Sequence, residues 1–295
     1  MEHNKYIFAL GFFDGVHLGH QALLAACRRL AEEAGALPAA ITFQTHPMAL
    51  LGGEAPPLIS TMADRQRLLR GYGMEKIVAL PPTSDVMSTP WEDFLCQLVA
   101  QGAVGFVCGD DFRFGDRGMG SGEKLRSFCA RRGFPCAIVP EQTLDGRHIS
   151  SSYIRTQLET GDMATAVRFL GHPHILTGEV VPGQQLGRRL GIPTANLRLD
   201  GSLAVPKFGV YACTCLVEDK RFPAVTNIGV RPTVSGHGIT VEPWILDYEG
   251  DLYGRQITLE FRKFLRPERK FANLEALTAE IHENARQTRQ LLEHL

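Results

Sequence analysis

The spacing between predicted strands changes near residue 155, and this change constrains the fold more than any other feature of the sequence. Before it, short apolar runs alternate with segments long enough for helices. The runs predicted as strands cover residues 6–10, 39–43, 76–80, 104–108 and 136–139. Strand–helix–strand units of this length join parallel strands through right-handed crossovers. The first half is therefore predicted to be an α/β domain with an open, doubly wound sheet.

Two predicted helices in this half carry clear signals at their ends. The first has an apolar face from Leu23 to Ala31 and ends at Gly35. Residues 89–92, Thr-Pro-Trp-Glu, have the spacing of a capping box with proline at the first helical position. The second helix is therefore predicted to run from this box to about Gln101.

In the second half, strand patterns follow one another with no room for crossover helices. They cover residues 174–181, 209–217, 222–228, 240–248 and 256–264. Consecutive short strands of this kind close as an antiparallel barrel or sandwich.

Helices are expected on both sides of these strands. One or two short helices at 154–171 have Asp162 as a cap, and a final helix begins near Asn273. The residues predicted on the inner face of the final helix are Leu274, Leu277, Ile281 and Leu291 or Leu292. We therefore expect one domain at 1–156, a helical connector at 157–172 and a second domain at 173–295.

Charge and cysteine content narrow the class of protein. Lys and Arg number 31 against 32 Asp and Glu, and the formal net charge of −1 gives no support to bulk binding of nucleic acid or a membrane surface. No apolar stretch approaches the roughly 18 residues of a membrane span, and the apolar run at 6–13 has no cleavage site behind it. The seven cysteines include no C-x-x-C pair, so they are expected to be reduced core thiols of a cytoplasmic protein.

A glycine- and histidine-rich block at residues 11–20 lies between the first predicted strand and the first helix. At the carboxyl edge of an open sheet, backbone amides beside a helix N-terminus bind phosphate. Gly11, Gly15 and Gly19 allow a ligand to approach closely, while His17 and His20 are spaced to donate to charge developing on one phosphoryl oxygen. The block therefore predicts a phosphate-binding site whose histidines face a phosphoryl group.

Other interpretations of these motifs are weaker. The block could be an ordinary glycine turn with two surface histidines, and His17, His20 and His46 could hold zinc, although no second-shell partner for such a site is identifiable. Residues 118–124 resemble a P-loop only superficially, because Glu123 precedes the lysine. We expect that segment to be a mobile loop.

A second glycine-spaced loop follows the first strand of the second half. Gly183, Gly187 and Gly191 precede Thr194 and Asn196, which lie two apart in an extended segment. Backbone amides of such a loop can cradle phosphates, and the two side-chain oxygens can reach one Mg²⁺. An ordinary loop is the alternative.

The block at 11–20 resembles the His-x-Gly-His nucleotidyltransferases, and its form G-x-F-D-G-x-H-x-G-H is similar to the FMN adenylyltransferase module of bifunctional riboflavin kinase/FAD synthetases. Three further blocks match that module, at residues 45–47, 109–115 and 149–155. The resemblance implies that ATP is bound by residues of the first and last blocks, namely Gly11, Phe13, Asp14, Gly15, His17, Gly19, His20, Ser152 and Arg155. It implies that the flavin lies near His46, Asp111, Phe112 and Phe114.

In that scheme the FMN phosphate attacks the α-phosphorus of ATP and pyrophosphate leaves. His17, His20, Arg155 and Mg²⁺ would neutralise the spreading charge. Asp111 is expected to face the isoalloxazine or a metal, because an acid beside an anionic substrate would repel its phosphate.

The second half is similar to riboflavin kinases in the block Pro193–Asn196 and in blocks at 206–212, 227–233 and 251–254. The resemblance implies a six-stranded Greek-key barrel with a C-terminal helix. It implies ATP at Gly183, Gly187, Gly191, Thr194 and Asn196, with the last two holding Mg²⁺. Flavin-binding residues implied in the same way are Asn227, Arg231 and Thr233.

The resemblance assigns the general base of the kinase to Glu242. Its ordinary pKa near 4.3 leaves it ionised and ready to accept a hydroxyl proton. Pro243 and Trp244 replace the family's usual small residue and histidine, and because proline has no amide donor this strand is expected to be an edge or bulged there.

Five basic residues crowd the segment 262–270, but no alternating aromatic platform accompanies them, so a solvated face or one ion-paired within the domain is expected rather than a nucleic-acid site. The sequence thus predicts an enzyme that makes FMN from riboflavin and ATP and then FAD from FMN and ATP. A single-activity FAD synthetase with an inactive flavin-binding barrel is one alternative. A non-catalytic flavin-responsive regulator is the other.

Overall fold

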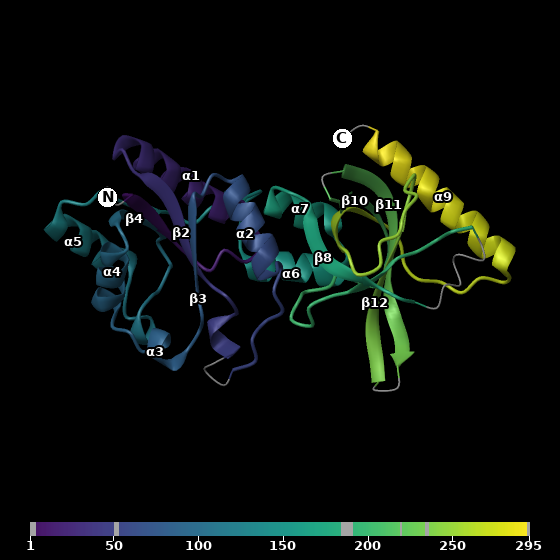
Figure 1. Ribbon diagram of the computed structural model, residues 1–295, viewed down its shortest axis with the longest axis horizontal. Helices are drawn as coiled ribbons and strands as arrows, with labels where there is room; N and C mark the ends of the chain where they lie inside the picture. Colours follow the sequence, from purple (N-terminus) through teal and green to yellow (C-terminus); the bar gives the residue numbers. More distant parts are fainter. Residues whose placement is uncertain (1–3, 50–52, 184–190, 219, 234–235, 294–295) are drawn as a thin grey trace. The chain divides into compact units, whose positions relative to one another are not determined.

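The structure, a computed structural model, describes residues 4–49, 53–183, 191–218, 220–233 and 236–293; only the backbone is described at 49, 231–233, 236 and 237. The chain forms two compact units, one of Met1–Leu58 with Met62–Ser151 and one of Ile59–Thr61 with Ser152–Leu295. Figure 1 traces the chain through both. Each unit is described separately below.

The first unit is a parallel sheet in the order β3-β2-β1-β4-β5, which confirms the doubly wound α/β domain. Its strands are β1 (Tyr6–Leu10), β2 (Leu37–Phe43), β3 (Lys76–Leu80), β4 (Ala103–Gly109) and β5 (Cys136–Val139). Its α-helices are α1 (Leu18–Glu33), α2 (Met62–Gly71), α3 (Ser84–Met87), α4 (Trp91–Ala100) and α5 (Gly122–Arg132). Short elements complete it: the 3-10 turns η1 (Asp14–Val16), η2 (Pro47–Ala49) and η3 (Asp116–Gly118), and the hairpin β6 (Thr143–Leu144) with β7 (Arg147–His148).

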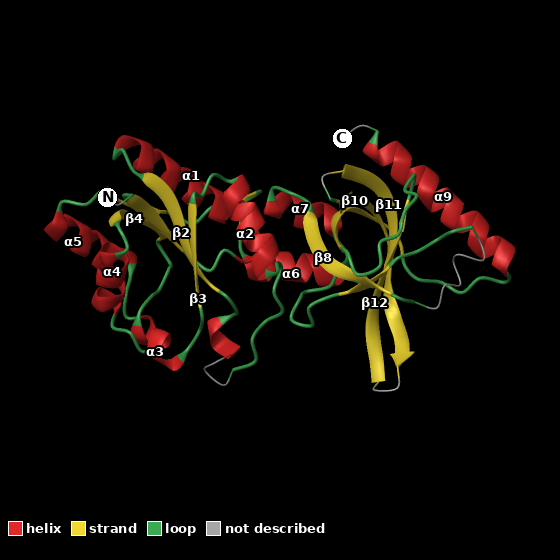
Figure 2. Ribbon diagram, viewed as in Figure 1, coloured by secondary structure: helices red, strands yellow, loops and turns green. Residues whose placement is uncertain are grey.

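Alternation along β1 explains why helices cover both faces of this sheet, as Figure 2 shows. Ile7 and Ala9 are buried in one core with residues of α1 and α2. Phe8 and Leu10 are buried in a second core with residues of α4 and α5. A strand that is apolar on both faces is typical of a parallel sheet buried on both sides.

Two local predictions in this unit are wrong. The cap of α4 is Pro90, with no side-chain hydrogen bond to the helix, and the Thr89 hydroxyl instead donates to the Asp85 carbonyl at 2.8 Å. The hydroxyl that would cap the helix is therefore engaged by the preceding turn, and α4 begins at Trp91, one residue later than the capping box predicts. Residues 122–124, expected in a loop, form the first turn of α5, and Ser121 accepts a hydrogen bond from Lys124 N.

The second unit is a closed antiparallel barrel in the order β10-β11-β12-β9-β8-β13, so the barrel prediction is confirmed and the sandwich alternative is wrong. Its strands are β8 (His174–Val181), β9 (Asn196–Arg198), β10 (Gly209–Val217), β11 (Lys220–Thr233), β12 (Gly236–Ile245) and β13 (Gln256–Arg266). Its helices are α6, which spans Ser151–Thr160 and begins at the last residue of the first unit, α7 (Met163–Leu170) and α9 (Leu274–Leu292). β9 was not predicted, because three residues carry no readable alternation.

Pro243 lies inside β12 without a shift of register against β11. On its other side β12 pairs with the short β9 through Val241 and Leu197 and forms a bridge between Trp244 and Thr194. The Pro243 carbonyl accepts from Ala195 N at 2.9 Å. The expected bulge is therefore absent between β11 and β12. Proline fits because the ladder on this side is short and uses its carbonyl.

The helix caps predicted in this unit are confirmed, and one inner-face residue is wrong. Asp162 accepts from Thr165 N and Asn273 accepts from Ala276 N. Leu274 is 56 % exposed, since the first turn of α9 extends beyond the barrel surface, whereas Ala285 is buried with residues of the barrel.

All seven cysteines are free thiols, and five are buried, as expected of core residues. Burial raises the pKa of Cys27, Cys108 and Cys215 to about 12, so these thiols stay protonated and unreactive at neutral pH. Among the described residues, no helix is long and apolar enough to cross a membrane.

Candidate active site

The glycine- and histidine-rich block forms a tight loop between β1 and α1, which we call the motif loop (residues 11–20). Its backbone is left-handed at Phe13 (φ 56°), Gly15 (φ 75°) and Val16 (φ 41°). A β-branched residue in this region is strained by about 1–3 kcal/mol and persists only where its surroundings hold it. Strain of this kind is typical of functional sites.

The two histidines of the motif loop are brought together as predicted. Their rings stack with centroids 3.7 Å apart and planes 16° apart. His17 is the N-cap of α1, and its Nδ1 accepts from His20 N at 3.3 Å. A Cβ at Gly19 would lie 3.2 Å from His17 Nδ1, so glycine leaves room for this ring.

A cavity of about 230 Å³, which we call the histidine cavity, lies over these rings at the carboxyl ends of β4 and β5. Its polar lining comes from His17, His20, Asp110, Asp111, Glu141, Gln142, His148, Ser150 and Ser151. Ser151 Oγ also donates to the Asp14 carbonyl at 3.0 Å, which ties the last block of the unit to the motif loop. The cavity stands where open α/β sheets bind nucleotides.

Burial, the neighbouring His17 and the charge of Arg65 hold the pKa of His20 well below its ordinary 6.5. His20 is therefore neutral at pH 7 before ligand binds. Its Nδ1 is buried and makes no hydrogen bond within the described part of the chain. A neutral imidazole donates a single N–H, as hydrogen-bond catalysis requires, without bringing a full charge.

The remaining ATP-binding candidates of the motif loop are buried. Phe13 is fully buried and packs edge-on against His20, with ring centroids 5.3 Å apart. The Asp14 carboxylate lies 3.6 Å from the Arg65 guanidinium, and both side chains are buried. Gly15 is buried as well, whereas Gly11 lines a second cavity.

That second cavity, of about 220 Å³, is predominantly apolar, and we call it the apolar cavity. Its lining includes Phe12, Phe43, Leu80, Phe94, Phe112 and Phe114. Of the predicted flavin residues, Phe112 and Phe114 therefore lie here, whereas Asp111 lines the histidine cavity. The loop after β4 thus contributes adjacent residues to two adjoining cavities.

His46 lies against Phe12 with ring centroids 5.0 Å apart, and its Nδ1 accepts from Met48 N at 3.2 Å. Among the residues that the structure describes, no group of three or more His, Cys, Asp or Glu side chains is placed to hold a metal ion. His46 is thus engaged away from the stacked pair, and the geometry gives no support to the zinc alternative.

Ser152 and Arg155 lie in α6, within the second unit. Their predicted contacts with ATP phosphates at the motif loop therefore stay predictions.

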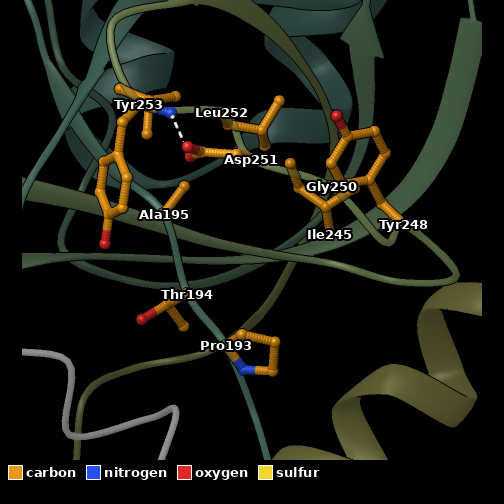
Figure 3. A pocket seen from close by; sticks show the side chains of 10 residues that line it. Pro193, Thr194, Ala195, Ile245, Tyr248, Gly250, Asp251, Leu252 and Tyr253 are labelled. Carbon is orange, nitrogen blue, oxygen red and sulfur yellow. Dashed lines mark hydrogen bonds between the residues drawn. The ribbon is translucent and has the colours of Figure 1, made fainter.

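In the second unit, a cavity of about 360 Å³ lies beside the block Pro193–Asn196, and we call it the tyrosine cavity. Figure 3 shows Tyr248 and Tyr253 on opposite sides of it, with Thr194 below. The Asp251 carboxylate accepts from Tyr253 N at 3.0 Å, which fixes the turn that carries this tyrosine. Aromatic walls combined with polar groups such as Thr194 and Asp251 suit a flat ring with hydrogen-bonding edges such as adenine.

A further cavity of about 350 Å³ lies between the barrel strands and α9, and we call it the glutamate cavity. Its lining includes Thr194, Val225, Asn227, Glu242, Trp244, Arg266, Glu268 and Ile281. Asn227 and Glu242 are direct partners in the β11–β12 ladder, as are Val225 and Trp244. Thr194 lines both this cavity and the tyrosine cavity, so the predicted base and the predicted metal ligand meet at one boundary.

The glycine-spaced loop of the barrel, residues 183–191, is described only at Gly183 and Gly191. A Cβ at Gly183 would lie 2.1 Å from Asn196 Nδ2, so this glycine makes room for the predicted metal ligand. Gly191 has φ 71°, and Gly187 lies outside the described residues. Arg231 and Thr233 pair through β11 with Gly238 and Gly236, but their side chains lie outside the described part.

The basic segment 262–270 is ion-paired within the unit, as predicted. Arg262 pairs with Glu260 at 2.7 Å, and Arg266 and Arg269 both pair with Glu280 of α9. Of these residues, Arg266 and Arg269 also line the glutamate cavity.

Several lining residues were missed. His148 carried no signal, because its hairpin is only two residues per strand. Tyr253 lies in the block 251–254, and Tyr248 lies three residues before that block. Only closure of the barrel brings the two tyrosines to the cavity that Thr194 lines. Arg65, which lines neither the histidine cavity nor the apolar cavity but pairs with Asp14, was missed as well, because only the segments packed around α2 decide that a guanidinium is buried there.

Comparison with known proteins accounts for both units. A model described as FAD synthetase matches residues 1–153, and one described as riboflavin kinase matches residues 170–292. A crystal structure described as a macrolide-efflux protein from Streptococcus pneumoniae is 28 % identical, with a TM-score of 0.87 over 98 % of this chain and 95 % of that chain.

Proteins named bifunctional riboflavin kinase/FMN adenylyltransferase match nearly the whole chain. The one from Pseudomonas fluorescens is 36 % identical over 98 % of this chain and 94 % of its own. The one from Bacillus subtilis is 34 % identical over 96 % of this chain and 91 % of its own. The one from Escherichia coli is 34 % identical over 93 % of this chain and 89 % of its own. With both family models matched in order and the site blocks in place, the chain belongs to the bifunctional riboflavin kinase/FMN adenylyltransferase family.

Proposed function

We propose that this chain carries out both reactions for which its relatives are named. The second unit transfers the γ-phosphoryl group of ATP to riboflavin and forms FMN. The first unit transfers the adenylyl group of ATP to FMN and releases pyrophosphate and FAD. The observation that carries the proposal is that each unit has two adjoining cavities with polar groups at their boundary, as direct transfer between two bound substrates requires.

In the kinase, ATP occupies the tyrosine cavity and riboflavin the glutamate cavity. Glu242 takes the proton of the ribityl hydroxyl as that oxygen attacks the γ-phosphorus. Asn227 and Trp244 line the flavin side of the cavity, and Arg231 and Thr233 are proposed to extend it. Thr194 and Asn196 are the residues that would hold Mg²⁺, since both offer oxygen ligands and Gly183 leaves space beside Asn196. When bound, Mg²⁺ neutralises charge on the transferring phosphate.

In the adenylyltransferase, ATP occupies the histidine cavity and the flavin ring the apolar cavity. His17 and His20 donate to the α-phosphate as the FMN phosphate oxygen attacks it, while Ser152 and Arg155 are proposed to bind the leaving pyrophosphate. Asp14 shapes the motif loop through its ion pair with Arg65.

One assay separates this proposal from its rivals. Purified protein is incubated with Mg²⁺, ATP and either riboflavin or FMN, and the flavins are separated by chromatography. FAD from both substrates is expected. FAD from FMN alone identifies a single-activity synthetase with an inactive barrel, and no product from either identifies a binding protein.

We also propose that residues 1–156 and 173–295 are separate catalytic domains joined by 157–172. α7 packs against β8 and β13, and Lys207 N donates to the Leu158 carbonyl of α6 at 2.9 Å. A fragment starting at Ser152 is therefore expected to make FMN and to be more stable than one starting at Pro173. A folded but inactive Ser152 fragment, judged by circular dichroism, would contradict the assignment of complete kinase chemistry to the barrel.

A cytoplasmic location accompanies this proposal. Seven unpaired cysteines fit a reducing compartment, where disulfides rarely persist. Cell fractionation with detection of FAD synthesis tests it.

A further inference from the structure

Arg65 is an arginine of α2 with no exposed side-chain surface. Its Nη2 lies 3.6 Å from the Asp14 carboxylate, and its Nη1 donates to the Phe43 carbonyl at 3.0 Å. Its Cζ lies 4.4 Å from the centre of the Phe12 ring. Burying a guanidinium costs free energy unless the group is paired and hydrogen-bonded. The contacts with Asp14 and Phe43 therefore hold the Arg65 side chain in one position.

The contacts of Arg65 join the motif loop, which also lines the histidine cavity, to the end of β2. Phe12 belongs to the motif loop, whereas Thr42 and Phe43 end β2, and all three line the apolar cavity. Thr42 bridges them further, because its hydroxyl donates to the Phe12 carbonyl at 2.6 Å and accepts from Arg65 Nη1 at 3.4 Å. The positive charge of Arg65 also helps to lower the pKa of His20 in the histidine cavity.

The geometry points to Arg65 as a positioning residue for adenylyl transfer: its guanidinium ties the motif loop to the end of β2 and so fixes the histidine cavity relative to the apolar cavity. Rigid clamping is needed here because the loop is left-handed at Phe13, Gly15 and Val16. The inference rests on the proposed function of the first unit, and two of the measurements below do not need turnover.

The test replaces Arg65 in three ways within the full-length protein. Arg65→Lys keeps the charge but loses the planar fork, so it cannot reach Asp14 and Phe43 together. Arg65→Gln also loses the charge. Thr42→Val removes only the bridging hydroxyl, with little change in volume, and serves if either arginine variant fails to fold. Arg67→Lys and Arg67→Gln are matched controls, because Arg67 lies on the same helix, has 46 % of its side chain exposed and pairs with Asp64 of that helix at 3.2 Å, so they report the loss of an arginine ion pair within α2.

Misplacement of reacting groups by about 1 Å costs about 10²-fold in rate. We expect kcat for FAD formation from FMN to fall between about tenfold and 10²-fold in Arg65→Lys and Arg65→Gln, and less in Thr42→Val. KM for FMN should rise, and FMN formation from riboflavin should keep the wild-type rate in every variant. The Arg67 variants should match the wild type.

Two measurements on the free protein distinguish positioning from general stability. Histidine proton NMR titration, with His20→Ala to assign the signal, should show a higher pKa for His20 in Arg65→Gln but not in Arg65→Lys. Calorimetric titration with ATP should show weaker binding in both Arg65 variants than in the Arg67 variants.

The inference is overturned if folded Arg65→Lys and Thr42→Val make FAD with the kcat and KM of the Arg67 controls. It is overturned equally if the His20 titration and ATP binding are unchanged in Arg65→Gln. Should the wild type itself make no FAD, the proposed function fails, while the titration and ATP binding still test the role of Arg65.

Discussion

The histidine cavity and the glutamate cavity obtain their central residues in different ways. His17 and His20 project from one short loop, held by the helix start and by Asp14 and Arg65 behind it. Thr194, Asn227 and Glu242 come from three separate segments of a barrel and meet only because its strands close. The first site therefore depends on local backbone geometry, whereas the second depends on strand register and on the packing of α9.

The sharpest way to test this difference is to remove the proposed kinase base. Glu242→Gln keeps the shape of the side chain but cannot take the hydroxyl proton, so conversion of riboflavin to FMN should fall by about 10² to 10⁴-fold. FMN to FAD should proceed at the wild-type rate, because that reaction uses the other unit. Both rates are measured by chromatography of the flavins.

Glu249→Gln is the matched control, since Glu249 is exposed in the turn after β12. It should leave both activities unchanged. Wild-type kinase turnover in Glu242→Gln would show that Glu242 is an ordinary barrel residue. Asp247 would then be the next candidate, or Glu249 if Glu249→Gln itself lost kinase activity.

The corresponding substitution in the first unit is His20→Ala in the motif loop. Loss of one donor aimed at the transferring group should lower FAD formation by about 10²-fold or more. Riboflavin phosphorylation should persist in the same preparation and serves as the internal control. Stoichiometric zinc in the wild type that disappears in His20→Ala would overturn the phosphate interpretation.

A third prediction concerns the stability of the barrel and its dependence on pH. His174 in β8 is 1 % exposed, and burial together with the nearby His172 lowers its pKa to about 3. Because the unfolded chain binds this proton near pH 6.5, the barrel should lose stability as pH falls from 6.5 towards 3, by about 2 kcal/mol at pH 5. His174→Phe should remove this share of the pH dependence.

The measurement uses urea unfolding in a Trp91→Phe background, where Trp244 is the remaining tryptophan and reports on the barrel. Neither ring nitrogen of His174 has a hydrogen-bond partner within the described part of the structure. The phenylalanine variant should therefore be at least as stable as the wild type at pH 7. An identical pH dependence in the two proteins would contradict the assignment.

The smallest expected effect is at the cap of α9, which closes the glutamate cavity. Asn273→Ala removes the acceptor for Ala276 N and should cost about 0.5–2 kcal/mol of stability. Asn273→Gly should cost only about a few tenths of a kcal/mol, because glycine is tolerated at this position. Urea unfolding and KM for riboflavin are measured together, and FAD formation from FMN should not change. Equal losses in both variants would indicate that Asn273 acts through something other than the cap.

Much of the architecture was predictable because it depends on local patterns. Apolar runs at the correct spacing defined all five parallel strands of the first unit and most strands of the barrel. The prediction was wrong where tertiary context overrides a local signal, as at Thr89, Leu274 and the start of α5. β9 was missed because closing a barrel can recruit a segment as short as three residues.

The motif loop shows what the sequence by itself determined: the stacked pair of His17 and His20 follows from three-residue spacing at a helix start, which is a local property. Arg65, Tyr248 and Trp244 show what only the tertiary structure decided. A buried guanidinium, or an aromatic wall shared by distant strands, is specified by the segments that pack around it. Such contacts depend on strand register and helix packing, and these are set by the whole chain at once rather than by the residues beside them.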